Sequence, residues 1–347
     1  MRIGVNCVHL APKSGDADIF LRNTLRALRA GHPEIELILF TDPVNDPSYE
    51  GWERVCVGGL GRESFFSRAD SAFRRAVQSA RIDRLLTPLA TAPPKPPAPM
   101  TPFVMDLRIL NPSPDAHHWW GEVRPRDLKK AAARASTIIV PSEYARRRLL
   151  DGLSVPLERI LVAAPGSDHV SGATQPCPVA RPFLLSVCDP EDHDKIPALV
   201  QVYERVRGEI PHNLIIVGEP SELEPPDWGD GIMRIHSLPV EQLTGLYQNA
   251  DLTICAVDKD GSGIKVLEAL ASGARVLVPR TGAIPDLARS APFYCDPSSV
   301  PSMANALLHA LEEPPEERAR RVRSGRQAVA EHTWARCADR VAAALRR

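Results

Sequence analysis

Long hydrophobic stretches are missing from this sequence. No apolar run approaches the roughly 18 residues that a transmembrane helix needs. The apolar run within residues 1–10 contains Asn6, is too short for a secretory signal peptide and has no small-residue cleavage site after it. We therefore expect a cytoplasmic protein.

The sequence also has almost no net charge and no closely spaced cysteine pair. The formal net charge is −1, which argues against nucleic acid as a partner because a protein that follows phosphates needs a basic surface. The seven cysteines are scattered, with no C-x-x-C pair and no histidine at zinc-finger spacing. We therefore expect reduced thiols and no metal site.

Charge and proline are unevenly distributed along the chain. Residues 1–180 hold 23 Lys and Arg against 19 Asp and Glu, a net charge of +4, whereas residues 181–347 hold 19 against 24, a net charge of −5. Proline is abundant at 34 residues, and five of these lie within residues 93–99. We expect that segment to be a stiff connection rather than a helix or strand.

Short apolar runs alternate with amphipathic stretches, and the pattern starts twice. At about 150 residues per domain, a chain of 347 residues predicts two domains. The predicted strands are residues 2–7, 35–40, 101–106, 137–140 and 160–164, then 183–188, 213–217, 233–238, 252–256, 275–278 and 292–295. Helices are predicted between them, including residues 196–206, 240–249 and 263–271. This alternation predicts the α/β class, with two doubly wound Rossmann-like domains and a ligand cleft between them.

Composition places the domain boundary near the middle of the chain. Residues 172–182 contain three prolines and show no periodicity, as is typical of a linker. We expect a first domain over residues 1–171 and a second over 183–332. We expect a final helix over residues 333–347 that crosses back to the first domain.

One segment carries most of the functional signal. After the strand that ends near Ala256, the chain turns through residues 260–263 and enters a helix that carries Glu268 and stops at Gly273. Glycines before a helix let backbone N–H groups approach an anion, with the helix dipole behind them. Asp260 and Glu268 flank this turn and are acceptors for hydroxyl groups, in charge-assisted bonds worth about 1.5–3 kcal/mol each. A diphosphate plus sugar hydroxyls describes a nucleotide sugar.

The segment DGSGIKVLEALASGARVLVP at residues 260–279 resembles the signature of the retaining glycosyltransferases of family 4, which have the GT-B fold. That signature is an acid, a Gly-x-Gly turn and a second Glu eight residues after the first. Residues 137–150, 164–168, 238–251, 282–286 and 333–334 resemble other parts of the family, so that the resemblance covers nearly the whole chain.

The resemblance implies a role for each matching residue. Glu268 would bind the ribose hydroxyls, and Asp260 hydroxyls of the transferred sugar. Gly261, Ser262, Gly263 and Ile264 would meet the sugar or diphosphate, with Gly15 contributing from the first domain. Lys195 falls at the lysine of the family's phosphate clamp, and Asp106 lies in its HDL motif; both are predicted catalytic residues together with Asp260. As a strand-end residue, Asp106 has a second interpretation, a local cap.

The sequence departs from the family pattern at three of these places. Asp189 stands at the clamp arginine, Asp18 at a usual glycine and Met105 at the histidine of the HDL motif. At about 4 Å and an effective dielectric constant near 20, one charge beside a diphosphate is worth about 4 kcal/mol, so the change at Asp189 is the most consequential. Asp260 and Asp286 stand where the family has Glu, which shortens each side chain by one methylene.

The implied reaction moves a hexosyl group from a nucleotide-diphosphate sugar to an acceptor hydroxyl with retention, without metal or cofactor, as in polysaccharide biosynthesis. The acceptor is a carbohydrate, a lipid-linked or a small molecule. Two alternatives remain: a catalytically weak or inactive GT-B protein that binds a nucleotide sugar or supports a partner enzyme, and another GT-B enzyme such as a nucleotide-sugar epimerase.

Two further clusters have open interpretations. His117, His118, Trp119 and Trp120 are typical either of an acceptor pocket or of a structural aromatic cluster. The three arginines at residues 146–148 are typical of a solvated helix face. Their functional interpretation is an anchor to anionic lipid, which would place the protein at the inner face of the membrane.

Overall fold

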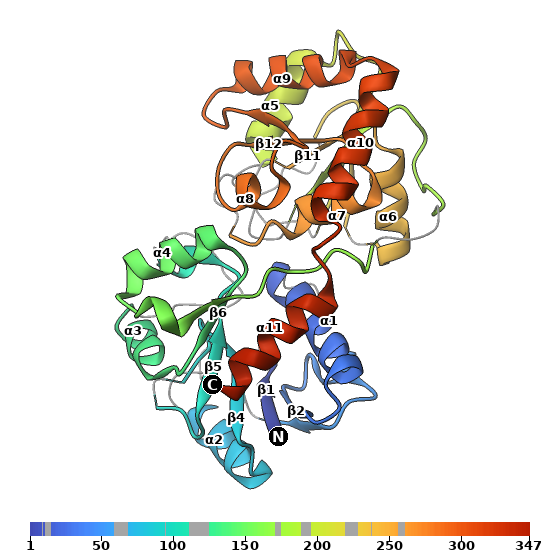
Figure 1. Ribbon diagram of the computed structural model, residues 1–347. Helices are drawn as coiled ribbons and strands as arrows, with labels where there is room; N and C mark the ends of the chain where they lie inside the picture. The colour runs from blue at the N-terminus through green and yellow to red at the C-terminus, as the bar shows by residue number, and fades with distance from the viewer. Residues whose placement is uncertain are drawn as a thin grey trace. The chain divides into compact units, whose positions relative to one another are not determined.

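The chain forms two compact units, each built around its own parallel sheet. The computed structural model describes residues 1–8, 10, 15–58, 69–93, 95–110, 125–170, 175–188, 196–218, 228–236, 238–255 and 261–347 (Figure 1). Unit 1 consists of Met1–Pro165 together with Trp334–Arg347, and unit 2 of Gly166–Thr333.

Unit 1 contains a seven-stranded parallel sheet in the order β3-β2-β1-β4-β5-β6-β7. Its strands are β1 (Arg2–Asn6), β2 (Glu36–Thr41), β3 (Arg54–Cys56), β4 (Arg84–Pro88), β5 (Met100–Phe103), β6 (Ile138–Val140) and β7 (Ile160–Val162). Its helices are α1 (Asp16–Gly31), α2 (Ala69–Ala80), α3 (Pro125–Arg134), α4 (Glu143–Leu153) and α11 (Trp334–Arg346). The outward order from β1 through β2 to β3, and from β4 through β5 to β6, is that of a Rossmann-like fold.

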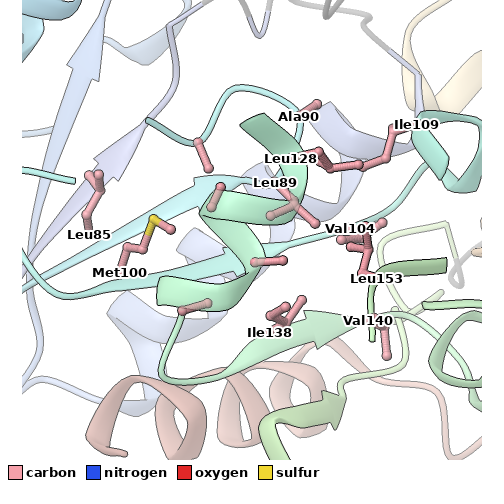
Figure 2. Close-up of a cluster of buried hydrophobic side chains, with 14 of the residues drawn as sticks. Leu85, Leu89, Ala90, Met100, Val104, Ile109, Leu128, Ile138, Val140 and Leu153 are labelled. Carbon is pink, nitrogen blue, oxygen red and sulfur yellow. The ribbon is translucent and has the colours of Figure 1, made fainter. Parts of the chain in front are cut away.

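A hydrophobic core covers one face of this sheet (Figure 2). Leu85 of β4, Met100 of β5 and Ile138 of β6 are buried in it, together with Leu128 of α3 and Leu153 of α4. Strands buried on both faces read as continuous apolar runs rather than as alternating ones. The short apolar segments of the sequence therefore fold into this sheet.

Helix α11 packs on α1 within unit 1 (Figure 1). The Trp334 ring lies 6.3 Å from the Phe20 ring in an edge-to-face arrangement, and Thr24 Oγ1 meets Cys337 Sγ at 3.7 Å. His32 Nε2 lies 2.9 Å from Asp339 Oδ1 farther along the pair. The amphipathic pattern of the final residues thus buries its apolar face against the first helix of the chain.

Unit 2 contains a six-stranded parallel sheet in the order β10-β9-β8-β11-β12-β13. Its strands are β8 (Phe183–Val187), β9 (Asn213–Val217), β10 (Ile232–Ile235), β11 (Leu252–Ile254), β12 (Val276–Pro279) and β13 (Phe293–Cys295). Its helices are α5 (Ile196–Val206), α6 (Val240–Asn249), α7 (Ile264–Ser272), α8 (Ile284–Ala288), α9 (Val300–Glu312) and α10 (Pro315–Val329).

The helices of unit 2 fall into two groups. Helices α5 and α9 contact each other and share a core with one set of strand residues, among them Leu214 of β9 and Leu252 of β11. Helices α6, α8 and α10 each contact α7, which also contacts β12 (Figure 1). The doubly wound arrangement predicted for both halves is confirmed.

The proline-containing segment before β8 packs on unit 2. Gln175 N donates to Gln248 Oε1 at 2.9 Å, and Arg181 Nη2 lies 2.6 Å from Asp251 Oδ1. A Cβ atom at Gly245 of α6 would lie 2.2 Å from Pro176 O, so only glycine permits this approach. These residues belong to unit 2, which begins at Gly166, ahead of the predicted linker at residues 172–182.

Two strands of unit 1 were not predicted from the apolar pattern: the exposed edge strand β3 and strand β4. Strand β4 is short and ends at Pro88, and it becomes a strand because it fits between β1 and β5 in the sheet. Tertiary pairing decides such short segments, because their local preference is weak.

Candidate functional site

A tight turn precedes helix α7 in unit 2. Gly263 has φ 66°, in the left-handed region, and a Cβ atom there would lie 2.6 Å from Leu287 Cδ1. Both facts require glycine at this position. The buried Ser262 accepts a hydrogen bond through Oγ from Ile264 N at 3.3 Å. The backbone N–H groups at the start of α7 therefore follow a glycine turn, an arrangement that favours the approach of an anion.

Glu268 lies on the same helix and is only 3% exposed. Its Oε1 lies 3.0 Å from His169 Nε2, and its Oε2 accepts a hydrogen bond from the Tyr247 hydroxyl at 3.4 Å. A buried carboxylate needs such donors, because its desolvation is costly. Each carboxylate oxygen has two lone pairs, so both oxygens retain acceptor capacity beyond these contacts.

Burial and the charge of Glu268 both raise the pKa of Tyr247, whereas the charge of Lys265 opposes them. Burial raises the pKa of the Tyr247 phenol well above its ordinary value, and the negative charge of Glu268 raises it further. The positive charge of Lys265 lowers that pKa. Lys265 lies one turn before Glu268 on α7 and is 7% exposed. Tyr247 consequently keeps its proton and acts on Glu268 as a hydrogen-bond donor.

The turn that carries His169 is fastened to the end of unit 2. Ser167 N donates to His332 O at 2.9 Å, and Val170 N donates to Ser167 O at 3.2 Å. His169 itself is 17% exposed at its side chain. Residues from the beginning, middle and end of unit 2 therefore fix the surroundings of Glu268.

The structure brings part of the predicted site together. Gly261, Ser262, Gly263, Ile264 and Glu268 occupy one turn and the helix that follows it. The other predictions on unit 2 and the aromatic cluster lie outside the described residues: Lys195, Asp260 and Asp189, and His117, His118, Trp119 and Trp120.

In unit 1, the predicted residues have local partners. Gly15, with φ 70°, directly precedes α1, and Asp18 accepts a hydrogen bond from Arg22 Nε at 2.5 Å. Asp106 Oδ1 accepts from the backbone N and from Nε of Arg108, at 2.8 and 2.9 Å. This is the local cap anticipated as the second interpretation of Asp106.

Met105 and the three arginines of α4 are the remaining residues of unit 1 that the sequence analysis singled out. Met105 is buried beside the end of β5, where a thioether side chain packs as an apolar group. On α4, Arg146 Nη2 pairs with Glu143 Oε2 at 2.7 Å, whereas Arg147 and Arg148 are exposed. Contact with anionic lipid stays a prediction.

Sequence reasoning missed three members of the Glu268 surroundings. Lys265 lies inside the signature, Tyr247 in the helix before β11, and His169 directly follows Asp168 in a segment that resembles the family. No spacing pattern links His169 to Glu268, because the two residues are 99 positions apart. Only the fold shows that they are in contact.

The described residues contain neither a membrane-spanning helix nor a cluster of metal ligands. In the part of the chain that the structure describes, no helix is both long and apolar enough to cross a membrane. Over the same residues, no group of three or more His, Cys, Asp or Glu side chains is arranged to hold a metal ion.

Comparison with known sequences matches the part of the chain that contains the turn and Glu268. Residues 181–313 match the family described as "Glycosyl transferases group 1". O-antigen chain mannosyltransferase B from Escherichia coli is 23% identical over 208 residues, which cover 54% of this chain and 55% of that protein. The match thus spans about half the length of this curated relative.

Comparison with solved structures covers the whole chain. Sucrose-phosphate synthase from Thermosynechococcus elongatus has a TM-score of 0.79 at 17% identity, covering 100% of this chain and 98% of that one. A UDP-forming α,α-trehalose-phosphate synthase from Burkholderia vietnamiensis has a TM-score of 0.70 at 14% identity and covers 99% of both chains. These likenesses confirm the GT-B fold. Residues 181–313 thus resemble the group 1 glycosyl transferases, and the whole chain has the fold of these structural neighbours.

Proposed function

We propose that this protein transfers a sugar from a nucleotide-diphosphate sugar to an acceptor hydroxyl, with retention of the anomeric configuration. The observation that carries the proposal is the buried Glu268 behind a glycine turn, within the segment that matches group 1 glycosyl transferases. The UDP-forming name of one structural neighbour supports a nucleotide-sugar donor. The donor is a substrate, and the proposal includes neither a metal nor a cofactor.

In the proposed donor site, different protein groups bind the ribose, the diphosphate and the transferred sugar. The carboxylate of Glu268 accepts hydrogen bonds from the ribose hydroxyls. The backbone N–H groups at the start of α7 and the helix dipole stabilise the negative charge of the diphosphate. From the sequence resemblance we assign Lys195 to the diphosphate and Asp260 to the transferred sugar.

The proposed mechanism needs no protein nucleophile. The departing diphosphate accepts the proton of the acceptor hydroxyl on the face that it leaves, so the new bond forms on that same face. The protein contributes by positioning the two substrates and by stabilising the charge of the leaving group. The acceptor, which we propose to be a carbohydrate, a lipid-linked sugar or a small molecule, binds on unit 1.

One observation favours a second candidate function. Met105 is buried where the family signature has a histidine, and a thioether side chain neither donates a strong hydrogen bond nor carries a proton. The second candidate is accordingly a GT-B protein that binds a nucleotide sugar with little or no turnover, or that supports a partner enzyme.

A panel of UDP-, GDP- and dTDP-sugars separates these functions. We expect at least one to raise the melting temperature of the full chain, and we expect release of its nucleoside diphosphate by transfer or slow hydrolysis. Stabilisation without release over long incubation would favour the second candidate. No stabilisation by any donor would contradict the transferase and the nucleotide-binding form of the second candidate, and would leave support of a partner enzyme.

A matched pair of variants locates the site. We expect Glu268→Ala to abolish the donor-dependent stabilisation. Glu241→Ala removes an exposed acid from the first turn of α6 and serves as the control that keeps it. Unchanged binding in Glu268→Ala would show that the donor site lies elsewhere.

A further inference from the structure

His169 contacts Glu268, the proposed hydrogen-bond acceptor for the ribose hydroxyls. His169 itself lies outside the segment that matches the glycosyl transferase family. Its Nε2 lies 3.0 Å from Glu268 Oε1, whereas the family match begins at residue 181. An imidazole N–H facing a carboxylate oxygen donates a charge-assisted hydrogen bond, which is stronger and more directional than a neutral one. His169 therefore determines the orientation of one oxygen of Glu268.

Tyr247 holds the other oxygen of the same carboxylate. Its hydroxyl donates to Glu268 Oε2 at 3.4 Å from a fully buried position on α6. With one donor on each oxygen, rotation of the carboxylate about its last bond would break both contacts. Each oxygen keeps a lone pair, and their directions are fixed by the donors already in place.

The backbone around His169 is itself held in place. Ser167 N and Ser167 Oγ both donate to His332 O, at 2.9 and 3.4 Å, and Val170 N closes the turn onto Ser167 O. His169 thus belongs to a fastened turn rather than to an extended surface segment. A side chain on such a support can position another group accurately.

We propose that His169 is a positioning residue for the nucleotide: it fixes the Glu268 carboxylate so that its remaining lone pairs accept both hydroxyls of a ribose. This inference rests on the proposed function, because it deepens the assignment of Glu268. The vicinal diol is the group already assigned to Glu268; the new step is that His169 makes the site favour ribonucleotides over 2′-deoxyribonucleotides. A site built to accept two hydroxyl groups discriminates against a ligand that lacks one.

The test compares UDP with 2′-deoxy-UDP, and GDP with 2′-deoxy-GDP, by titration calorimetry on the full chain. For the nucleotide that binds, we expect the wild type to favour the ribose form by about tenfold to one hundredfold. We expect His169→Ala to reduce this preference to less than about threefold. His169→Gln should restore most of it, because the Gln amide is also a donor to the carboxylate.

The preference ratio separates positioning from mere folding. A general loss of stability weakens the binding of both nucleotides alike and leaves their ratio unchanged. His309→Ala removes an imidazole that packs against Phe293 elsewhere in unit 2, and it serves as the matched control that keeps the wild-type ratio.

Each outcome has a definite meaning. A wild-type preference that persists in His169→Ala overturns the role of His169 and leaves the proposed function intact. Binding without any preference in the wild type overturns the assignment of the diol to Glu268. Absence of binding to any of the four nucleotides overturns the proposed function, and this inference with it.

Discussion

Helix α1 of unit 1 and helix α7 of unit 2 both follow a glycine but differ in what holds their buried acids. Each follows a glycine with positive φ, Gly15 at 70° and Gly263 at 66°. In α1, Asp18 pairs with Arg22 of the same helix, one turn later. In α7, Glu268 is held by side chains from two other segments, His169 and Tyr247.

The difference separates a local structural pair from a site assembled by the fold. Arg22 also donates to Ser48 O at 3.0 Å and lies over the Tyr49 ring at 4.4 Å, so the Asp18 pair belongs to the packing of unit 1. Glu268 lies behind a glycine turn with acceptor capacity remaining on both oxygens. A buried acid therefore indicates a ligand site only when its partners leave it room to accept another donor.

The largest expected effect is the loss of folding stability when alanine replaces Gly263, compared with the same change at Gly15. We expect Gly263→Ala to reduce the free energy of unfolding by about 2–4 kcal/mol, because the left-handed backbone and the clash with Leu287 add together. Gly15→Ala carries a backbone cost of about 1–3 kcal/mol, because φ 70° with ψ −148° is a conformation essentially restricted to glycine. Chemical denaturation of both variants measures the difference. Equal losses would mean that Leu287 moves aside at little cost.

The next effect is a loss of nucleotide affinity that we expect at Glu268 but not at Asp18. We expect Glu268→Gln to weaken nucleotide binding by about tenfold or more, because an amide supplies one acceptor oxygen in place of two. Asp18→Asn should lower stability by about 1–3 kcal/mol, since it weakens a largely buried pair, and leave nucleotide affinity unchanged. Calorimetry and denaturation on both variants form the test. A matching loss of affinity in Asp18→Asn would refute the division between pair and site.

A smaller effect is expected at Tyr247. Tyr247→Phe removes a hydroxyl whose hydrogen bond to Glu268 is long, at 3.4 Å, and keeps the buried ring. We expect nucleotide affinity to fall by about two- to fivefold, less than in His169→Ala. Titration of both variants with the same nucleotide gives the ranking, and the reverse order would make Tyr247 the main support of the carboxylate.

The smallest effect concerns pH and lies away from the site. Burial lowers the pKa of His212 below its ordinary value of 6.5, although the nearby Asp251, at 3.5 Å, raises it in part. The unfolded chain therefore binds this proton at higher pH than the folded chain does. Stability is lost as pH falls through about 6.5 and below. We expect His212→Gln to flatten this dependence in melting curves between pH 7.5 and 5.5, and an unchanged slope would assign it to other groups.

The sequence predicted regular elements best where apolar runs were bounded by clear signals. Helices α5 and α6 and strand β9 have the predicted bounds, and α7 begins one residue late and ends at Gly273 as expected. Strand β10 lies at Ile232–Ile235 rather than at residues 233–238, because Pro239 and the start of α6 follow closely. Element ends depend on pairing and capping, which periodicity does not contain.

The candidate site was predictable in part for the same reason. Gly261, Gly263 and Glu268 were predicted because they lie in one contiguous segment whose spacing has a chemical meaning. Arg22 and Arg108 were not predicted as partners of Asp18 and Asp106, although both lie within four residues of them, because such pairs are common on any surface.

By itself the sequence determined the α/β class, the two units and the glycine turn that leads into α7, since all of these depend on local periodicity and on residues adjacent in the chain. Only the tertiary structure decided which side chains surround Glu268. The turn at residues 166–170 is far in sequence from helices α6 and α7, and it meets them because a parallel sheet orders its strands by packing rather than by their succession along the chain.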